Sequence, residues 1–249
     1  MRIFYLGNNL LGLRVLEFLK KQKEKICGLA VHLSEKAKYV NEIINCSRLE
    51  KSKIISGDRI NGPETVKKIE RLKPDIILSI CFGYILKPEI IRVPPLGVIN
   101  LHSAYLPCNR GANPNVWSIV NATPAGVSLH YIDAGIDTGD IIAQEQVPVD
   151  WLDTARTLYE KLEKEAFKLF QQSWPDIKSG KIKIRKQVGK GSFHRLKDLE
   201  RIDRIDLGKK YKAKDLINIL RSRTFPPYNG AYIEVNGRRI YLRLELYES

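Results

Sequence analysis

The first half of the chain alternates short apolar runs with longer segments in which apolar residues recur every three or four positions. The runs predict strands at residues 3–6, 26–33, 54–55, 75–80 and 97–101. The segments between them predict helices at residues 11–23, 36–44 and 63–72. Regular alternation of strand and helix indicates an α/β fold, and we expect a Rossmann-like mixed sheet with helices on both faces.

The second half changes character along its length. Residues 127–131 and 141–147 predict antiparallel strands, which make the sheet mixed, and residues 154–174 predict a long helix. After Gly180 the periodicity weakens, until a helix is predicted at residues 213–221 and a β-hairpin around the turn Asn236-Gly237. We therefore expect a domain of residues 1–180 and a small C-terminal α+β subdomain of residues 181–249 that ends in the hairpin.

Composition is that of a water-soluble protein with no metal centre. The chain has 249 residues, of which 43% are hydrophobic, enough for one large domain with a small appendage. No apolar stretch approaches the ~20 residues that span a bilayer as a helix, so we expect no membrane association. The four cysteines and four histidines are scattered without the spacing of a zinc site. These features favour a cytoplasmic protein in a reducing compartment.

The net charge of +14 has three possible meanings: a nucleic-acid partner, an anionic small substrate, or a heat-adapted surface rich in Lys and Glu. The basic residues are spread along the chain, and residues 160–165 alternate Glu and Lys as on an exposed helix face with ion pairs. Most of the charge is therefore expected to be solvated surface. The remainder would produce a field that favours a diphosphate-bearing substrate.

Asn100 and His102 are the leading candidates for catalytic residues. They are two residues apart at the end of the predicted 97–101 strand, so their side chains share one face, and Asp137 in a Gly-rich turn could complete the group. An imidazole can take a proton from an attacking amine, an amide N–H can donate to an oxyanion, and a carboxylate can orient the imidazole. Singly, each residue also fits a structural role: a satisfied strand-end His, a capping Asn, and a common Asp-Thr-Gly turn.

Three ordered motifs give these residues more weight. They are Asn100-Leu101-His102-Ser103-Ala104-Tyr105-Leu106-Pro107, Arg110-Gly111-Ala112-Asn113-Pro114, and the segment from Asp133 to Gly139. Together they resemble the formyltransferases that use 10-formyltetrahydrofolate, although Ser103 stands where many members carry Pro. The resemblance implies that Asn100, His102 and Asp137 fill the catalytic positions and that no metal is required.

The resemblance also implies where the folate cosubstrate binds. Its pterin is expected in a slot between two segments and to be held largely by backbone hydrogen bonds. The residues of this slot are Phe82, Gly83, Tyr84, Ile85 and Leu86 on one side, and Asp133, Gly135 and Ile136 on the other.

The loop from Arg110 to Trp117, the segment Gly191 to Arg195 and the stretch from Leu220 to Tyr232 are similar to the sugar N-formyltransferases. This similarity implies a nucleotide-linked amino sugar as the formyl acceptor, in glycan or lipopolysaccharide biosynthesis. Arg110 and Asn113 become candidate substrate residues. Phe225 and Tyr228 offer ring faces for stacking, or alternatively pack within the C-terminal subdomain.

Other functions remain open on the sequence alone. A methionyl-tRNA formyltransferase resembles the catalytic half but carries a larger C-terminal β-barrel, and the residues after 180 are few for such a barrel. A glycinamide ribonucleotide formyltransferase would need no C-terminal segment after the catalytic domain. A nucleic-acid-binding relic of the fold would fit the charge but not an intact set of Asn100, His102 and Asp137, so a nucleic-acid partner is not expected.

The turn Gly7-Asn8-Asn9 follows the first strand but lacks the middle Gly of a dinucleotide-binding fingerprint. Asn8 and Asn9 could hold a substrate phosphate or hydroxyl there, or form a plain strand-to-helix turn.

The hairpin at residues 232–246 has an apolar face that includes Leu242 and Leu244. A two-stranded hairpin is marginal alone in water and needs a covering surface, either its own catalytic domain or a second chain. A terminal edge strand favours symmetric pairing, so we predict a homodimer through this hairpin.

Overall fold

The computed structural model describes residues 1–33 and 37–248. The chain divides into two compact units, and each is described by itself. The first consists of Met1–His102, Ser128–Gln144 and Ala166–Gln187, and the second of Ser103–Val127, Glu145–Glu165 and Val188–Ser249. The boundary predicted near residue 180 is a single cut, whereas each unit combines segments from different parts of the chain.

A seven-stranded mixed sheet has the strand order β3-β2-β1-β4-β5-β7-β8. Its strands are β1 (Arg2–Gly7), β2 (Lys25–Val31), β3 (Ile54–Ser56), β4 (Ile76–Ile80), β5 (Val98–His102), β7 (Ala125–Tyr131) and β8 (Ile141–Val147). Strands β3 to β5 pair in parallel through β2, β1 and β4, and β7 runs antiparallel to β5. β1 and β4 are continuous apolar runs because they are buried on both faces.

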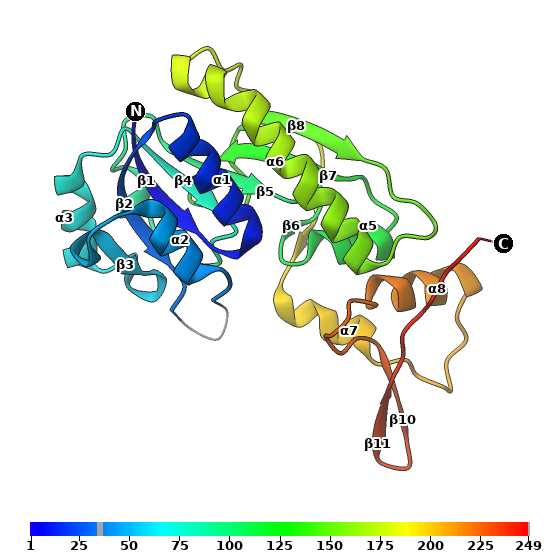
Figure 1. Cartoon of the computed structure of the whole chain (residues 1–249). Coiled ribbons are helices and arrows are strands. Elements are labelled where there is room, and N and C mark those ends of the chain that lie inside the picture. Colours follow the sequence, from blue (N-terminus) through cyan, green and yellow to red (C-terminus); the bar gives the residue numbers. More distant parts are fainter. Residues whose placement is uncertain (34–36, 249) are drawn as a thin grey trace. The chain divides into compact units, whose positions relative to one another are not determined.

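Helices cover both faces of this sheet, as the alternation predicted (Figure 1). Phe4 and Leu6 of β1 point to a core shared with Ile69 of α3 (Pro63–Leu72) and Ile90 of α4 (Pro88–Ile91). The alternate residue Tyr5 donates a 2.6 Å hydrogen bond to Gly12 O in α1 (Asn9–Lys21).

Two predicted helices differ from the structure by more than two residues at one end or both. The helix predicted at residues 36–44 is α2 (Val40–Ser47), and Lys36 lies outside the described residues. The helix predicted to end at Trp174 is α6 (Ala155–Ser179), which continues through Pro175. Trp174 and Ile177 are both buried, so tertiary packing on either side of the proline carries the helix past it.

The second unit contains α5 (Pro114–Val120), α8 (Ala213–Ser222) and a short parallel pair of β6 (Arg110–Gly111) and β9 (Phe193–His194). It also contains a 3-10 helix at Leu196–Leu199 and α7 (Glu200–Asp203), whereas the 3-10 helices at Lys51–Lys53 and Gly57–Arg59 belong to the first unit. Gly111 has φ +85°, and a Cβ there would lie 2.3 Å from His194 O, so only glycine permits this pairing.

The predicted hairpin forms but is shorter than expected. It consists of β10 (Tyr232–Val235) and β11 (Arg238–Tyr241), and both turn residues, Asn236 and Gly237, have positive φ. The second strand ends at Tyr241. Leu242 N–H still donates to Ala231 O in the hairpin register, but Leu244 N–H donates to the Thr224 hydroxyl, so the chain leaves the hairpin there.

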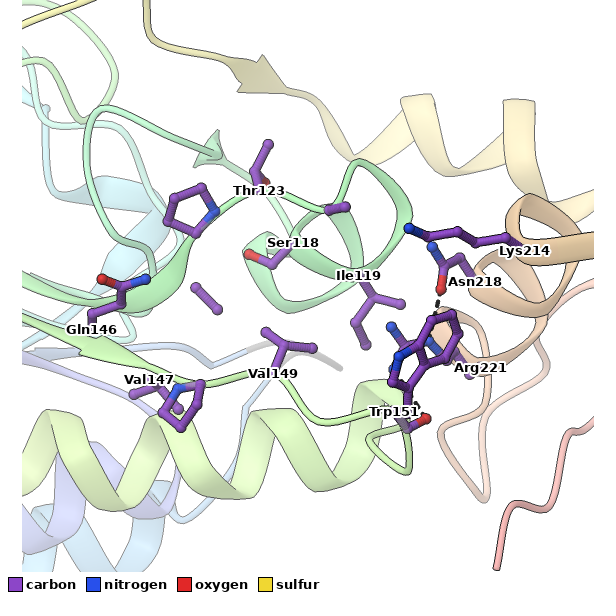
Figure 2. Close-up of a pocket in the computed structure, with 14 residues that line it drawn as sticks. Ser118, Ile119, Thr123, Gln146, Val147, Val149, Trp151, Lys214, Asn218 and Arg221 are labelled. Carbon is purple, nitrogen blue, oxygen red and sulfur yellow. Dashed lines mark hydrogen bonds between the residues drawn. The ribbon is translucent and has the colours of Figure 1, made fainter.

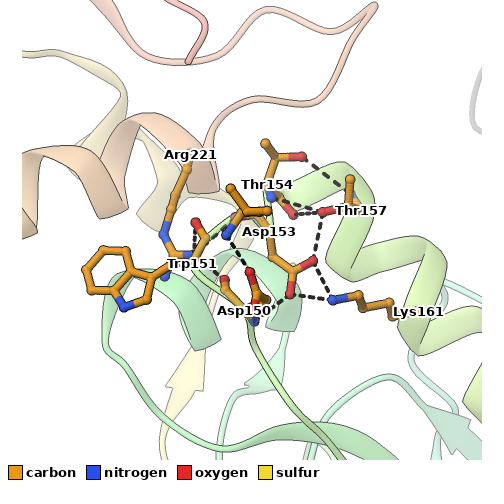
Figure 3. Close-up of polar contacts among 8 residues, drawn as sticks. Asp150, Trp151, Asp153, Thr154, Thr157, Lys161 and Arg221 are labelled. Atoms are coloured by element: carbon orange, nitrogen blue, oxygen red, sulfur yellow. Dashed lines mark hydrogen bonds and ion pairs between the residues drawn. The ribbon is translucent and has the colours of Figure 1, made fainter. Parts of the chain in front are cut away.

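A polar network ties the loop before α6 to α8 within the second unit (Figure 3). The buried Asp153 carboxylate accepts hydrogen bonds from Asp150 N–H at 2.7 Å, the Thr157 hydroxyl at 3.0 Å and Lys161 Nζ at 2.8 Å. Arg221 of α8 donates through Nη1 to the backbone carbonyls of residues 150, 151 and 153. These bonds satisfy a buried carboxylate and give the loop a defined conformation.

Candidate active site

The structure brings the three predicted catalytic residues together at the end of β5. His102 Nε2 lies 3.5 Å from Asp137 Oδ2, and Asn100 Nδ2 lies 3.5 Å from Asp137 Oδ1. Asn100 and His102 are both half-buried on the same face of the strand, as their spacing predicted. An amide donor, an imidazole and a carboxylate therefore occupy one small volume.

His130 of β7 completes this group, and the sequence reading missed it. It is paired with Asn100 across the antiparallel ladder, and its Nε2 lies 3.1 Å from Asn100 Nδ2 and 3.5 Å from Asp137 Oδ1. A lone His in an apolar strand suggests a core residue. The available signal was that Ser128 and His130 are polar at alternate positions of a buried strand, and both are fully buried.

The neighbours of His130 determine its tautomer. Nδ1 lies 2.8 Å from the carbonyl oxygen of Tyr131, which can only accept, so Nδ1 carries a proton. In the neutral ring Nε2 is then an acceptor for one N–H of the Asn100 amide. His130 thereby orients that amide with its nitrogen toward the centre of the group.

The loop that carries Asp137 is held by side chains on both sides. Asp133 Oδ1 accepts from Gly135 N–H at 2.9 Å and from the Thr138 hydroxyl at 2.6 Å. Gln187 Nε2 donates to Asp137 O and to Gly139 O, each at 2.8 Å. Asp137 itself has φ +52°, so its backbone conformation depends on these contacts.

The predicted folate residues form two segments, residues 82–86 after β4 and residues 133–136 after β7, in which all of these residues except Leu86 are exposed or half-exposed. Gly83 N–H donates to His32 Nε2 at 3.0 Å, and the His32 ring packs on the rings of Phe82 and Tyr84. His32 is a further residue that the sequence reading did not include. Leu86 is buried in the core and Ile85 is 68% exposed. Gly135 and Ile136 are exposed in the Asp137 loop.

Asn8 and Asn9 hold the turn after β1 to the segment before α2. The Asn8 side chain is buried and its Oδ1 accepts from Lys38 N–H at 2.9 Å, while Asn9 N–H donates to Lys38 O. Asn9 has φ +62°. These contacts give both residues a structural role, and their predicted contact with substrate stays a prediction.

In the second unit, Arg110 and Asn113 lie next to an aromatic pair. Trp117 of α5 stacks on His194 of β9, with ring centroids 4.1 Å apart and an interplanar angle of 8°. In the described part of this unit, three buried side-chain nitrogens have no hydrogen-bond partner: Asn113 Nδ2, Trp117 Nε1 and His194 Nε2. Burial lowers the pKa of His194, although nearby Asp198 partly opposes this, so the ring is neutral at neutral pH.

Phe225 and Tyr228 lie in an aromatic cluster of the second unit. Phe225 packs at 5.6 Å from Tyr159 and 5.7 Å from Tyr228, measured between ring centroids. Tyr228 is 52% exposed. The packing alternative is therefore realised for Phe225, and Tyr228 keeps a face open for stacking.

No group of three or more His, Cys, Asp or Glu residues in the described ranges is arranged to hold a metal ion. Among the same residues, no helix is both long and apolar enough to cross a membrane.

Comparison with known proteins supports one family along the chain. A model of the formyl transferase family matches residues 17–173, and a model of the N-formyltransferase dimerization C-terminal domain matches residues 198–248. A methionyl-tRNA formyltransferase from Halothermothrix orenii is 33% identical over 187 residues, which cover 75% of this chain. The chain spans only 58% of that relative's length.

Two solved structures are also similar. A 4-N formyltransferase from Francisella tularensis matches with a TM-score of 0.82 at 26% identity and covers 100% of this chain and 98% of its own. PseJ from Anoxybacillus kamchatkensis, a formyltransferase in complex with UDP-4,6-dideoxy-4-formamido-L-AltNAc and tetrahydrofolate, matches with a TM-score of 0.60 at 32% identity, over 89% of this chain and 98% of its own. With its α/β fold, its convergent site and these matches, the chain belongs to the formyl transferase family.

Proposed function

We propose that this chain transfers the formyl group of 10-formyltetrahydrofolate to the amine of a nucleotide-linked amino sugar. The observation that carries the proposal is the convergence of Asn100, His102 and Asp137 within 3.5 Å contacts at the end of β5. These groups are the donor, base and orienting carboxylate that acyl transfer to an amine requires. Family membership and the folate-bound relative support the same reaction.

The reaction follows from the properties of these groups. The amine nitrogen attacks the formyl carbon, and negative charge develops on the formyl oxygen. Asn100 Nδ2 donates one N–H to His130, and its contact with Asp137 is long at 3.5 Å, which leaves the second N–H for the oxyanion. His102 accepts the amine proton, and Asp137 stabilises the charged imidazole. Collapse of the tetrahedral intermediate breaks the bond to N10, which receives the proton held by His102, and releases tetrahydrofolate.

The folate is proposed to bind between the segment of residues 82–86 and the Asp133–Asp137 loop. The exposed Ile85 and Ile136 side chains offer apolar contact for a flat pterin ring. Backbone groups of the Asp137 loop would supply its hydrogen bonds, because the side-chain oxygen Oδ1 of Asp133 already binds within that loop.

The second unit supports a sugar nucleotide as the acceptor. The unpaired buried nitrogens of Asn113, Trp117 and His194 lie beside Arg110, and buried donors without partners are costly unless a ligand or water satisfies them. Arg110 supplies positive charge for a diphosphate. The C-terminal family match and the sugar-bound PseJ also favour this acceptor. Such a substrate would place the enzyme in cytoplasmic glycan or lipopolysaccharide biosynthesis.

Methionyl-tRNA is the second candidate acceptor, because the sequence relative from Halothermothrix orenii carries that name. A screen of nucleotide-linked amino sugars with 10-formyltetrahydrofolate, analysed by mass spectrometry for one added formyl group, tests the proposal. Formylation of a sugar amine is expected. Formylation of methionyl-tRNA with no sugar product would assign the activity to the alternative.

The proposed assembly is a homodimer through the C-terminal hairpin, in keeping with the matched dimerization domain. Ile240 of β11 is 47% exposed, and Leu242 and Leu244 after it are only half-buried. These side chains would be covered by a second copy. Light scattering should give twice the monomer mass of 28.5 kDa, and Leu242→Asp should shift the equilibrium to monomer. A monomer for the unmodified chain at micromolar concentration would contradict the dimer.

A further inference from the structure

The second unit contains a pocket of about 410 Å³ that no proposed catalytic or folate-binding residue lines. Its walls come from α5, the loop between β8 and α6, and α8. Figure 2 shows Lys214, Asn218, Arg221 and Trp151 gathered at one end, with Ser118 and Thr123 farther along. This volume lies in the range of ~300–1,000 Å³ that is usual for small-molecule sites.

Arg221 brings a buried positive charge to this pocket. It is 6% exposed, its Nη1 donates to three backbone carbonyls, and its Nε donates to Asn218 Oδ1 at 2.9 Å. Nη2 makes no hydrogen bond to a described residue, and the Asp150 and Asp153 carboxylates act on the guanidinium through space rather than by a direct ion pair. Burial lowers the pKa of Arg221 more than these two carboxylates raise it, so its charge is only partly compensated and the pocket favours an anion.

Trp151 supplies an aromatic face beside two cations. It is 57% exposed, with Arg221 Cζ 5.1 Å and Lys214 Nζ 5.9 Å from its ring centroid. An exposed indole can stack on a planar ring. The flexible Lys214 stem lets its ammonium reach an anionic group next to that ring.

Ser118 and Thr123 provide hydrogen-bond donors. The two N–H groups of Asn109 Nδ2 point to the two hydroxyl oxygens, each at 2.9 Å. Each oxygen therefore acts as an acceptor from Asn109, and each hydroxyl proton is directed elsewhere. Ser118 is buried, and its proton has no acceptor among the described residues.

We propose that this pocket binds a phosphorylated planar-ring compound of the size of a nucleoside monophosphate, separately from the formyl-transfer site. The phosphate pairs with Lys214 and with Arg221 Nη2. The ring stacks on Trp151, and acceptor atoms of the sugar or base receive the protons of Ser118 and Thr123.

The fluorescence of Trp151 also allows nucleotide binding to this pocket to be measured. The chain has three tryptophans, and Trp117 and Trp174 are 5% and 2% exposed, so quenching of fluorescence by iodide reports Trp151. Titration of the full chain with AMP and with UMP should give saturable protection from iodide for at least one of them. Lys214→Glu should weaken the affinity about tenfold or more, because it replaces attraction to phosphate with repulsion. Lys210→Glu, the same charge change at an exposed lysine before α8, should leave it unchanged.

Because a substitution at Trp151 or Lys214 can change the tryptophan fluorescence directly, the affinities for the same nucleotides are also measured by isothermal titration calorimetry. Binding must persist in His102→Asn, because the pocket is separate from the catalytic group. Four results would overturn the proposal: no saturable binding at millimolar nucleotide, wild-type affinity in Lys214→Glu, equal affinity for inorganic phosphate alone, or loss of nucleotide binding in His102→Asn.

Discussion

The amide nitrogen Nδ2 of Asn100 lies 3.1 Å from Nε2 of His130, a buried imidazole whose other nitrogen binds a backbone carbonyl. This contact orients the amide that is proposed to stabilise the oxyanion, so His130 is a positioning residue that acts through Asn100. The two should therefore behave as one unit in kinetics.

Asn100→Ala should lower kcat by about 10²–10³-fold, the usual loss for one oxyanion donor. His130→Ala should lower kcat by less, with KM for the folate little changed. The double variant should be no slower than Asn100→Ala, because His130 has nothing left to orient. Steady-state kinetics of the four proteins give the test, and losses that multiply would show that His130 acts independently.

Gln187, which is distant in sequence but bonded directly to the Asp137 loop, should hold that loop in its active conformation. Its amide donates to Asp137 O and Gly139 O, and Gln187→Ala removes both bonds, each contributing about 1 kcal/mol. We expect kcat to fall while the far-UV circular dichroism stays the same. Gln172→Ala, on the exposed face of α6, is the matched control. Equal kcat in the two variants would show that Gln187 does not hold the Asp137 loop for activity.

Asp153 should matter more for stability than its partner Lys161. Asp153→Ala leaves the Thr157 hydroxyl, Asp150 N–H and the Lys161 ammonium without their acceptor, and should lower the free energy of unfolding by about 1–3 kcal/mol. Lys161 is 45% exposed, so Lys161→Ala should cost less than about 1 kcal/mol. Urea denaturation of the full chain measures both. A larger loss for Lys161→Ala would contradict this order.

His194 should make stability depend on pH on the acidic side. Its pKa in the folded chain is lowered by burial, so the unfolded chain binds the proton more tightly. The free energy of unfolding is then unaffected well above the unfolded pKa of about 6.5 and falls as pH drops below it. In His194→Gln this part of the decline should disappear. Thermal unfolding midpoints at a series of pH values compare the two chains, and parallel curves would mean that His194 is not the group responsible.

Local pattern was enough to predict the seven strands of the main sheet, including the one that carries Asn100 and His102, but not short elements such as α4, α5 and the β6–β9 pair. Strand periodicity placed Asn100 and His102 on one face, and the structure brings Asp137 to them. Pro175 indicated a helix end, yet burial of Trp174 and Ile177 carries α6 onward. The hairpin turn at Asn236-Gly237 was predicted correctly, whereas the chain leaves the hairpin where Leu244 N–H binds the Thr224 hydroxyl, a contact that lies outside the local pattern.

Contacts between distant segments could not be read from the sequence. Gln187 lies 50 residues from Asp137 along the chain, and nothing around it marks a role in the loop. Arg221 lies in the stretch from Leu220 to Tyr232 that is similar to the sugar N-formyltransferases, but its burial and its carbonyl partners depend on the packing of α8 on α5. His130 was missed for the same reason, since its importance comes from the strand opposite.

The most direct test of the central claim is the ratio of kcat/KM for a nucleotide-linked amino sugar to that for methionyl-tRNA. Both reactions are measured with 10-formyltetrahydrofolate, in wild type and in His102→Asn. Wild type is expected to prefer the sugar strongly, and His102→Asn is expected to lose about 10²–10⁴-fold of this activity, the usual contribution of a positioned base. A preference for methionyl-tRNA, or a near-wild-type rate in His102→Asn, would contradict the central claim.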